Sequence, residues 1–108
     1  MADSPAPAVD YPYSLEIDGI AINHIRLVGT ITVASGPGQV TLAKALSGGR
    51  AFADWMNSRL RKNAALIRYD DMGNELTRYK VEGAQPTALS ADANEEFLTL
   101  DDEGVSTG

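Results

Sequence analysis

Apolar and polar residues alternate over several short stretches of the chain, and a period of two is typical of half-buried β-strands. The first such stretch places Tyr13, Leu15 and Ile17 on one face, with polar residues between them. Asp18-Gly19 follows directly, and this dipeptide favours the tight turn of a β-hairpin. The pattern therefore predicts a strand over 13–17 that turns back into a second strand.

The second predicted strand changes face along its length. Ile20 and Ile22 are two residues apart, but Ile25 falls on the opposite phase of the alternation. Such a change of phase needs either a β-bulge or a strand that passes between two environments. Asn23 and His24 lie at the point where the phase changes.

Further strands are expected along the rest of the chain, separated by turns rich in Gly, Pro, Asn and Asp. They lie at residues 39–44, 65–69, 76–81 and 95–100, whereas 82–94 is expected to be irregular. Residues 30–34 form either a further strand or the continuation of the second one. The pattern as a whole predicts about six strands.

One segment has the period of a helix instead. Phe52, Trp55, Met56 and Leu60 recur at spacings of three, four and four, so they share one face of a helix over about 50–62. Basic residues at its end complement the negative end of the helix dipole. We expect this face to pack on the sheet as core. The alternative is that Trp55 lies on an exposed assembly face, where aromatic anchors are common.

These elements predict an α+β domain that is mainly β, a small antiparallel β-barrel or sandwich with one flanking helix. The domain is expected over 11–105. Residues 1–10 are rich in Ala and Pro and are expected to form a flexible arm, and 106–108 a loose tail. The first ten residues lack the basic start and apolar core of a signal peptide, so we expect synthesis to end in the cytoplasm.

The charge and composition narrow the function. The formal net charge of −6 argues against tight nucleic-acid binding, which depends on clustered Lys and Arg. The chain has no cysteine, which excludes disulfides, thiolate metal sites and thiol nucleophiles. No apolar run approaches the roughly 18 residues of a membrane span. All nine bases lie between Arg26 and Lys80, which indicates either attraction between the middle and the ends of different copies or an ordinary solvated surface.

Candidate catalytic chemistry is sparse. His24 is the only histidine, and no motif marks a serine partner for it. The carboxylate pairs Asp70-Asp71, Glu95-Glu96 and Asp101-Asp102 lack the spacing of a calcium loop. The glycine-rich turns lack the spacing of a phosphate loop. We therefore expect no enzyme, and no catalytic, cofactor, metal or nucleic-acid site.

The order of the elements resembles the tail-tube family of contractile phages and of phage-tail-like injection particles. Four stretches carry the resemblance and together span most of the domain. They are YSLEIDG at 13–19, VTLAK at 40–44 leading through Gly48-Gly49 to FADW at 52–55, residues 65–73, and EFLTL at 96–100 followed by EGV at 103–105.

The resemblance implies a structural protein that is made in the bacterial cytoplasm and assembles with copies of itself. Six-membered rings would join sheet to sheet around a channel and stack into the inner tube of a phage tail or injection particle. The other implied partners are sheath and baseplate or cap proteins. Only residues 30–39 remain of a longer family segment that reaches neighbouring subunits. This leaves open whether the chain builds long tubes or forms a ring that caps or starts one.

The first and last predicted strands are the candidate assembly edges, because an unpaired strand edge invites pairing with another chain. The candidate residues are Tyr13, Leu15, Ile17, Phe97 and Thr99. A monomeric β-barrel that binds a partner peptide at such an edge is the alternative function.

Overall fold

The computed structural model describes residues 11–46 and 49–108, so the expected arm over 1–10 lies outside the described residues. The described residues form seven strands and one helix. In chain order these elements are β1 (Tyr13–Ile17), β2 (Ile20–Val28), β3 (Gly38–Ala45), α1 (Ala51–Ser58), β4 (Lys62–Tyr69), β5 (Glu75–Ala91), β6 (Glu95–Asp102) and β7 (Gly104–Thr107).

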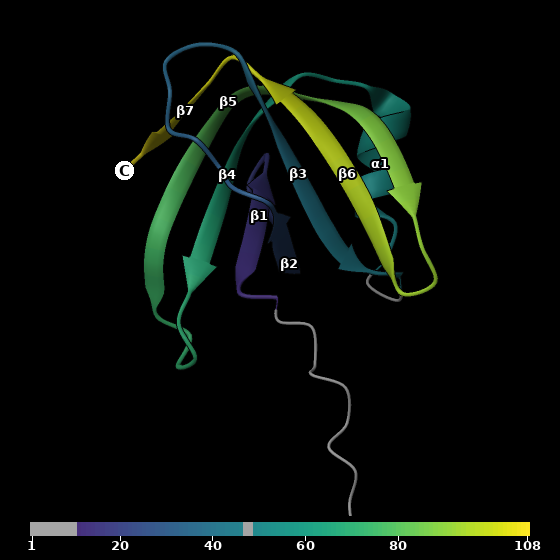
Figure 1. Cartoon of the computed structure of the whole chain (residues 1–108), viewed down its shortest axis with the longest axis horizontal. Helices are drawn as coiled ribbons and strands as arrows, with labels where there is room; N and C mark the ends of the chain where they lie inside the picture. Colours follow the sequence, from purple (N-terminus) through teal and green to yellow (C-terminus); the bar gives the residue numbers. More distant parts are fainter. Residues whose placement is uncertain (1–10, 47–48) are drawn as a thin grey trace, which may run out of the picture.

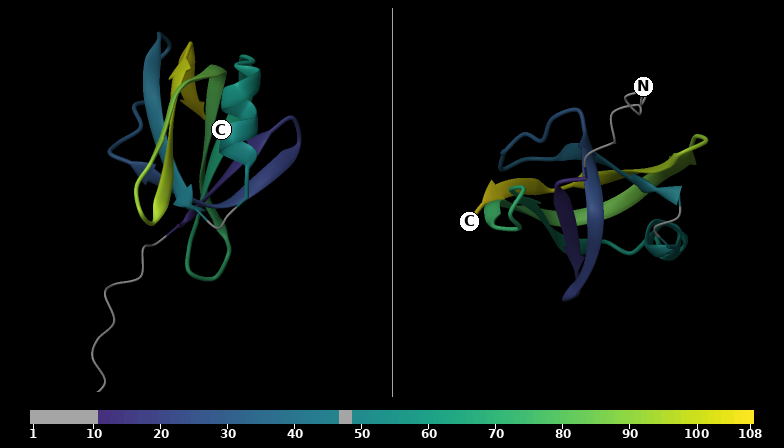
Figure 2. Two further views of the ribbon diagram at one scale, coloured as in Figure 1. Left: turned by 90° about the vertical axis from the view of Figure 1, so that its right-hand side faces the viewer. Right: turned by 90° about the horizontal axis from the view of Figure 1, so that it is seen from below.

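Six of the described strands close into an antiparallel barrel in the order β4-β1-β2-β3-β6-β5, with β5 pairing back to β4 (Figure 1). β5 takes part twice, because residues 75–84 pair with β4 and residues 85–91 pair with β6. β7 pairs with residues 79–82 of β5. α1 lies outside the barrel and packs against β5 (Figure 2). The predicted fold class, a mainly β barrel with one flanking helix, is confirmed.

The β1–β2 hairpin forms as the sequence predicts. Asp18 and Gly19 have φ values of 54° and 78°, and two positive φ angles are what a type I′ turn requires. Of the two explanations for the change of phase in β2, the bulge is present, because Leu15 lies opposite Ile22 whereas Tyr13, two residues earlier, lies opposite Ile25, three residues later. The extra residue is in the stretch that contains His24, whose φ is 61°.

The strand expected over 30–34 is wrong. Gly29, at φ 79°, turns the chain away from the sheet after β2. Among the described residues no strand pairs with the β-branched residues that follow, and Ala34 makes an isolated bridge with Val105 through hydrogen bonds of 3.0 and 2.8 Å. Strand propensity alone does not make a strand where no partner is within reach.

The irregular segment expected over 82–94 is also wrong for most of its length, since β5 continues to Ala91. The residues that suggested a break are accommodated at irregular points of the strand. Gly83 has a φ of 57°, and the register with β6 shifts between Pro86 and Ala88. Proline has no backbone N–H, so a β-bulge is one of the few places where a strand accepts it.

The helix is shorter than its apolar spacing predicts. Arg59 has a left-handed φ of 54°, and its N–H donates to the carbonyl of Trp55 at 2.9 Å, which ends α1 at Ser58. The chain enters β4 at Lys62, so the bases expected in the last helical turn follow the helix instead. Within residues 11–46 and 49–108, no helix is long and apolar enough to cross a membrane.

The last residues belong to the sheet rather than to the loose tail expected over 106–108. Ser106 and Thr107 lie in β7, opposite Lys80 and Tyr79 of β5. The N–H of Gly108 donates to the carbonyl of Arg78 at 3.2 Å. The C-terminal residues form a strand because residues 79–82 of β5 offer an unpaired edge. The sequence pattern did not predict that edge.

Candidate functional site

The two strands predicted as assembly edges are internal strands of the barrel, with a paired strand on each side. β1 pairs with β2 on one side and with β4 on the other, and β6 pairs with β3 and β5. Tyr13, Leu15 and Ile17 therefore have neighbours on both sides, as do Phe97 and Thr99. The prediction that these two strands are free edges is wrong, because barrel closure uses the backbone groups that a second chain would need.

Open edges occur elsewhere among the described strands. Residues 26–28 of β2 pair with β3, but the register with β1 ends at Ile25. Residues 85–91 of β5 pair with β6, but the register with β4 ends at Ala84. The side chain of Gln85 accepts a hydrogen bond from Arg61 Nη2 and donates one to the backbone carbonyl of Arg59. The four-stranded portion β2-β3-β6-β5 thus ends on two strands whose outer sides have no strand partner within the described residues.

The outer face of this four-stranded portion carries mainly small or uncharged side chains. Cross-strand register aligns them in three rows: Arg26, Ala43, Phe97 and Ser90; Val28, Thr41, Thr99 and Ala88; Gln39, Asp101 and Gln85. The few charges are paired or hydrogen-bonded, since Asp101 accepts from the Gln39 amide at 2.9 Å and Arg26 is ion-paired. The face therefore presents a broad, nearly neutral surface.

The helix residues separate into a buried set and an exposed one. Phe52 is fully buried and Trp55 is 5% exposed, and the Trp55 indole N–H donates to the Leu60 carbonyl at 2.8 Å. Met56 is partly buried against the same core. Leu60 is 56% exposed because it lies beyond the end of α1. The expectation that Leu60 belongs to the core face is therefore wrong.

An apolar groove that the sequence did not predict separates α1 from the β1–β2 hairpin. This helix–hairpin groove has a volume of about 280 Å³ and includes Ile20, Ile22, Trp55 and Leu60 in its lining. Ile20 is 68% exposed. Its position directly after the Asp18-Gly19 turn was the available signal, because a residue beside a hairpin turn has few neighbours on its own strands.

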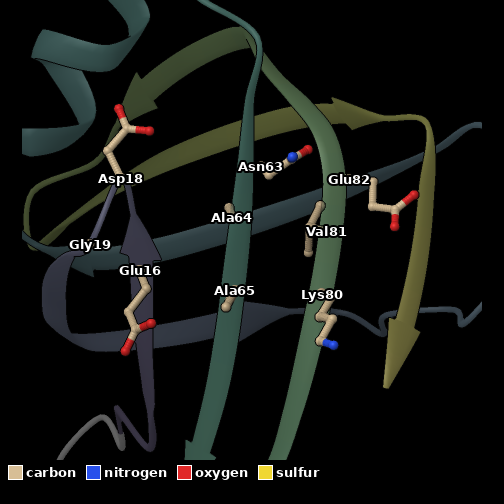
Figure 3. A pocket seen from close by; sticks show the side chains of 9 residues that line it. All are labelled: Glu16, Asp18, Gly19, Asn63, Ala64, Ala65, Lys80, Val81 and Glu82. Atoms are coloured by element: carbon tan, nitrogen blue, oxygen red, sulfur yellow. The ribbon is translucent and has the colours of Figure 1, made fainter. Parts of the chain in front are cut away.

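Figure 3 shows a second depression, of about 310 Å³, across β1, β4 and β5. It forms because Ala65 lies opposite Glu16 on one side and Lys80 on the other, and both of these side chains are longer. Glu16 is ion-paired with Arg78 at 3.3 Å. Among the residues that line this depression there is no histidine, serine or threonine, so it holds no Ser–His or Thr–His pair.

Most carboxylates of the three pairs already have partners within the chain. Glu95 is ion-paired with Arg26, while Glu96 lies 3.1 Å from Lys44 on the opposite side of β6. Asp70 accepts hydrogen bonds from backbone groups of its own turn, and the one from Asn74 is the main cause of its lowered pKa. The described residues contain no group of three His, Cys, Asp or Glu side chains placed to hold a metal ion.

Asp102 and Glu95 are the buried acids among the described residues, at 4% and 7% exposed, and of the two only Glu95 is ion-paired. Burial raises the pKa of Asp102, and the backbone N–H of Gly104 offsets part of this effect by donating to the carboxylate.

His24 is exposed at the β2 bulge. His24 lines a depression of about 570 Å³ together with Ser14 and Asp70. The Ser14 hydroxyl donates instead to Asn23 Oδ1 at 2.7 Å, and Asp70 accepts from the backbone of its own turn.

No protein-family model matches the sequence, and a search of curated proteins finds no match. Solved structures do match. Hcp1 from Flavobacterium johnsoniae is 18% identical with a TM-score of 0.65, over 91% of this chain and 95% of that chain. A chain of the anti-feeding prophage baseplate, from a 6-fold symmetrised cryo-EM structure, is 12% identical with a TM-score of 0.61, over 97% of both chains. At these identities the similarity establishes a shared fold, and it confirms the predicted resemblance at that level.

Proposed function

We propose that the chain is a structural subunit that assembles with copies of itself in the inner tube or baseplate of a phage tail or phage-tail-like contractile injection particle. The observation that carries this proposal is the shared fold with Hcp1 and with a chain of the anti-feeding prophage baseplate, which extends over nearly the whole length of each protein. Its closest partners are then other copies, followed by sheath and baseplate or cap proteins. Its role is structural rather than enzymatic.

Rings of six are the proposed assembly, in keeping with the 6-fold symmetry of the baseplate structure. The two open edges, residues 26–28 of β2 and 85–91 of β5, lie on different strands of one subunit. An edge of one copy that pairs with the other edge of the next gives a heterologous contact, and such contacts close into rings when the rotation allows. Each contact satisfies backbone groups otherwise left to water.

The nearly neutral outer face of β2-β3-β6-β5 is the proposed channel lining. Joining the two open edges of neighbouring copies would make this face continuous around the ring. Its residues are small and uncharged at the centre, including Thr41, Thr99 and Ala88. A lining without clustered Lys and Arg does not hold a passing nucleic acid through phosphate contacts.

A ring that caps or starts a tube is the second candidate. It is favoured by the short connection between β2 and β3, where residues 30–33 form no strand and Ala34 makes one bridge within its own chain. Rings that do not stack in solution would favour this role, and long stacks would favour the tube.

The test is the assembly state of the purified chain, measured by native mass spectrometry and negative-stain electron microscopy over a range of concentrations. The matched variants are Ala91→Pro and Ala91→Ser. The N–H of Asp92 donates to the carbonyl of Glu95, and the antiparallel alternation then directs the N–H of Ala91 to the open edge of β5.

Wild type and Ala91→Ser should form rings of six, whereas Ala91→Pro, which lacks that N–H, should form fewer rings at the same concentration. Melting curves check that both variants are folded. A chain that stays monomeric at every concentration would overturn the proposal and favour a monomeric binding domain.

A further inference from the structure

The helix–hairpin groove exposes more apolar surface than its neighbours on the same chain can cover. Ile20 is 68% exposed and Leu60 is 56% exposed, and they lie on the two sides of a space of about 280 Å³. Trp55 lies between them with its indole N–H already bonded to the Leu60 carbonyl. The Trp55 side chain is therefore held in place. An apolar side chain could bind beside it with little free energy spent on rearranging the groove.

An apolar side chain of matching kind projects from another part of the molecule. Met72, in the turn between β4 and β5, is 86% exposed, which is the largest exposed fraction of any large apolar residue in the described part of the chain. The turn is held by Asp70, whose carboxylate accepts from the N–H groups of Met72 and Asn74, both at 2.9 Å. Met72 is thus presented on a preorganised turn, and methionine adapts well to irregular apolar surfaces.

The charges nearest to the two features include one complementary pair. The groove is lined by one base, Lys62, and two acids, Asp18 and Asp54, of which Asp18 is ion-paired with Lys62 and Asp54 with Arg50. Arg59 lies in the chain between the lining residues Ser58 and Leu60.

The turn carries two acids, Asp70 and Asp71, and Glu75, which begins β5 after it, is ion-paired with Arg78 at 3.0 Å. Within residues 11–46 and 49–108 neither Arg59 nor Asp71 has an ion-pair partner, so each is available to a second molecule.

A single chain cannot fill its own groove with its own turn. Lys62, which lines the groove, begins β4, and the turn follows Tyr69 at the other end of that strand. An eight-residue strand spans about 25 Å. Figures 1 and 2 both place α1 at the end of the barrel opposite to the β4–β5 turn. The turn of the same chain therefore does not occupy the groove, whereas the turn of a second copy arranged end to end with the first could reach it.

We propose that the helix–hairpin groove of one copy receives Met72 of a second copy, and that this contact stacks copies end to end. The proposal rests on the proposed self-assembly and identifies the contact between successive rings. It takes the place of the long segment that the tail-tube resemblance implies and that this chain has shortened to residues 30–39. Asp71 of the turn then lies near Arg59, which adjoins the groove.

The absence of cysteine from the chain makes the contact directly testable by cross-linking. In the double variant Ile20→Cys/Met72→Cys, every copy carries both halves of the contact. A short bismaleimide should then join copies into a covalent ladder of dimers, trimers and longer species. Each single-cysteine variant alone should give little product, and an equal mixture of the two should give dimers only.

The matched control is Val33→Cys/Met72→Cys, since Val33 is 53% exposed but lies outside the groove. This variant should give no ladder. Rings without a specific Ile20–Met72 ladder would overturn the contact while leaving the proposed function in place. An equally strong ladder from the control would also overturn the contact. A monomer that forms neither rings nor ladders would overturn both proposals.

Discussion

Arg26 on β2 and Glu95 at the start of β6 form a two-point ion pair, with Nη2–Oε1 at 2.8 Å and Nε–Oε2 at 3.1 Å. The Tyr11 hydroxyl donates to the same carboxylate at 3.1 Å. One acid thus joins two strands and the segment before β1. The hydrogen bond from Arg26 is the main reason that the pKa of Glu95 lies below its ordinary value.

The first prediction concerns this ion pair. Because the folded-state pKa of Glu95 is depressed, its ionised form adds stability that is present above the unfolded pKa of about 4.3 and is lost as pH falls through the lower folded value. Glu95→Gln should cost about 1.5 to 3 kcal/mol at neutral pH. Urea unfolding at neutral pH and near pH 3 tests this, since the difference from wild type should shrink in acid. An equal difference at both pH values would contradict the assignment.

The second prediction concerns α1. Trp55→Ala should lower the free energy of unfolding by about 3 to 5 kcal/mol, as large-to-small changes in a packed core do. Leu60→Ala is the control, because a residue that is 56% exposed should change stability by no more than about 0.5 kcal/mol. Thermal melting of the non-assembled chain distinguishes the two. An unchanged midpoint for Trp55→Ala would show that this residue is not part of the core.

The sequence predicted well what depends on near neighbours. The Asp18-Gly19 turn and the bulge at His24 follow from local chemistry and from the phase of the apolar residues. The role of Tyr13 to Ile17 as an edge could not be judged in the same way. An alternating pattern reports which face of a strand is buried, whereas the neighbour of β1 on its second side is a strand some fifty positions later in the chain.

The same limit explains the groove and the missing strand. Ile20 and Leu60 come together only because α1 ends early and packs beside the hairpin, which no local pattern records. Residues 30–34 have the composition of a strand, but Gly29 directs them away from any partner. The sequence thus predicted the elements better than it predicted their contacts.

The third prediction concerns the backbone at the β2 bulge. His24 has a φ of 61°, a conformation that costs a residue with a side chain about 1 to 2 kcal/mol. His24→Gly relieves this strain but gives the unfolded chain more freedom, so stability should stay constant or rise by up to about 1 kcal/mol. His24→Val should lower it, because branching at Cβ makes this conformation worse. Calorimetry of both variants measures the order, and a Val variant as stable as the Gly variant would contradict it.

The fourth prediction concerns a buried charge. Lys44 is 2% exposed, lies 3.1 Å from Glu96, donates to the Gly49 carbonyl at 2.6 Å and has its ammonium 5.4 Å from the centre of the Phe52 ring. Lys44→Met leaves Glu96 without its counter-charge and should cost about 3 kcal/mol. Lys44→Met/Glu96→Leu should recover much of this loss, because two apolar side chains leave no unpaired charge. Urea unfolding of wild type, both single variants and the double variant gives the coupling free energy between the two side chains. Additive losses of unfolding free energy would show that the ion pair does not stabilise the fold.

Closure of the barrel also determines how the protein reaches its native state. Leu15 pairs with Leu66, and β3 obtains its second neighbour only when β6, the last strand of the barrel, is available. Pairings between such distant positions form slowly, because a long loop must close before any of their contacts is gained. A newly made chain therefore holds the β1–β2 hairpin and β3 with unpaired sides until the C-terminal strands arrive. During that interval these strands can pair with another incomplete chain. The yield of soluble protein therefore depends on the rate of barrel closure relative to the rate of aggregation.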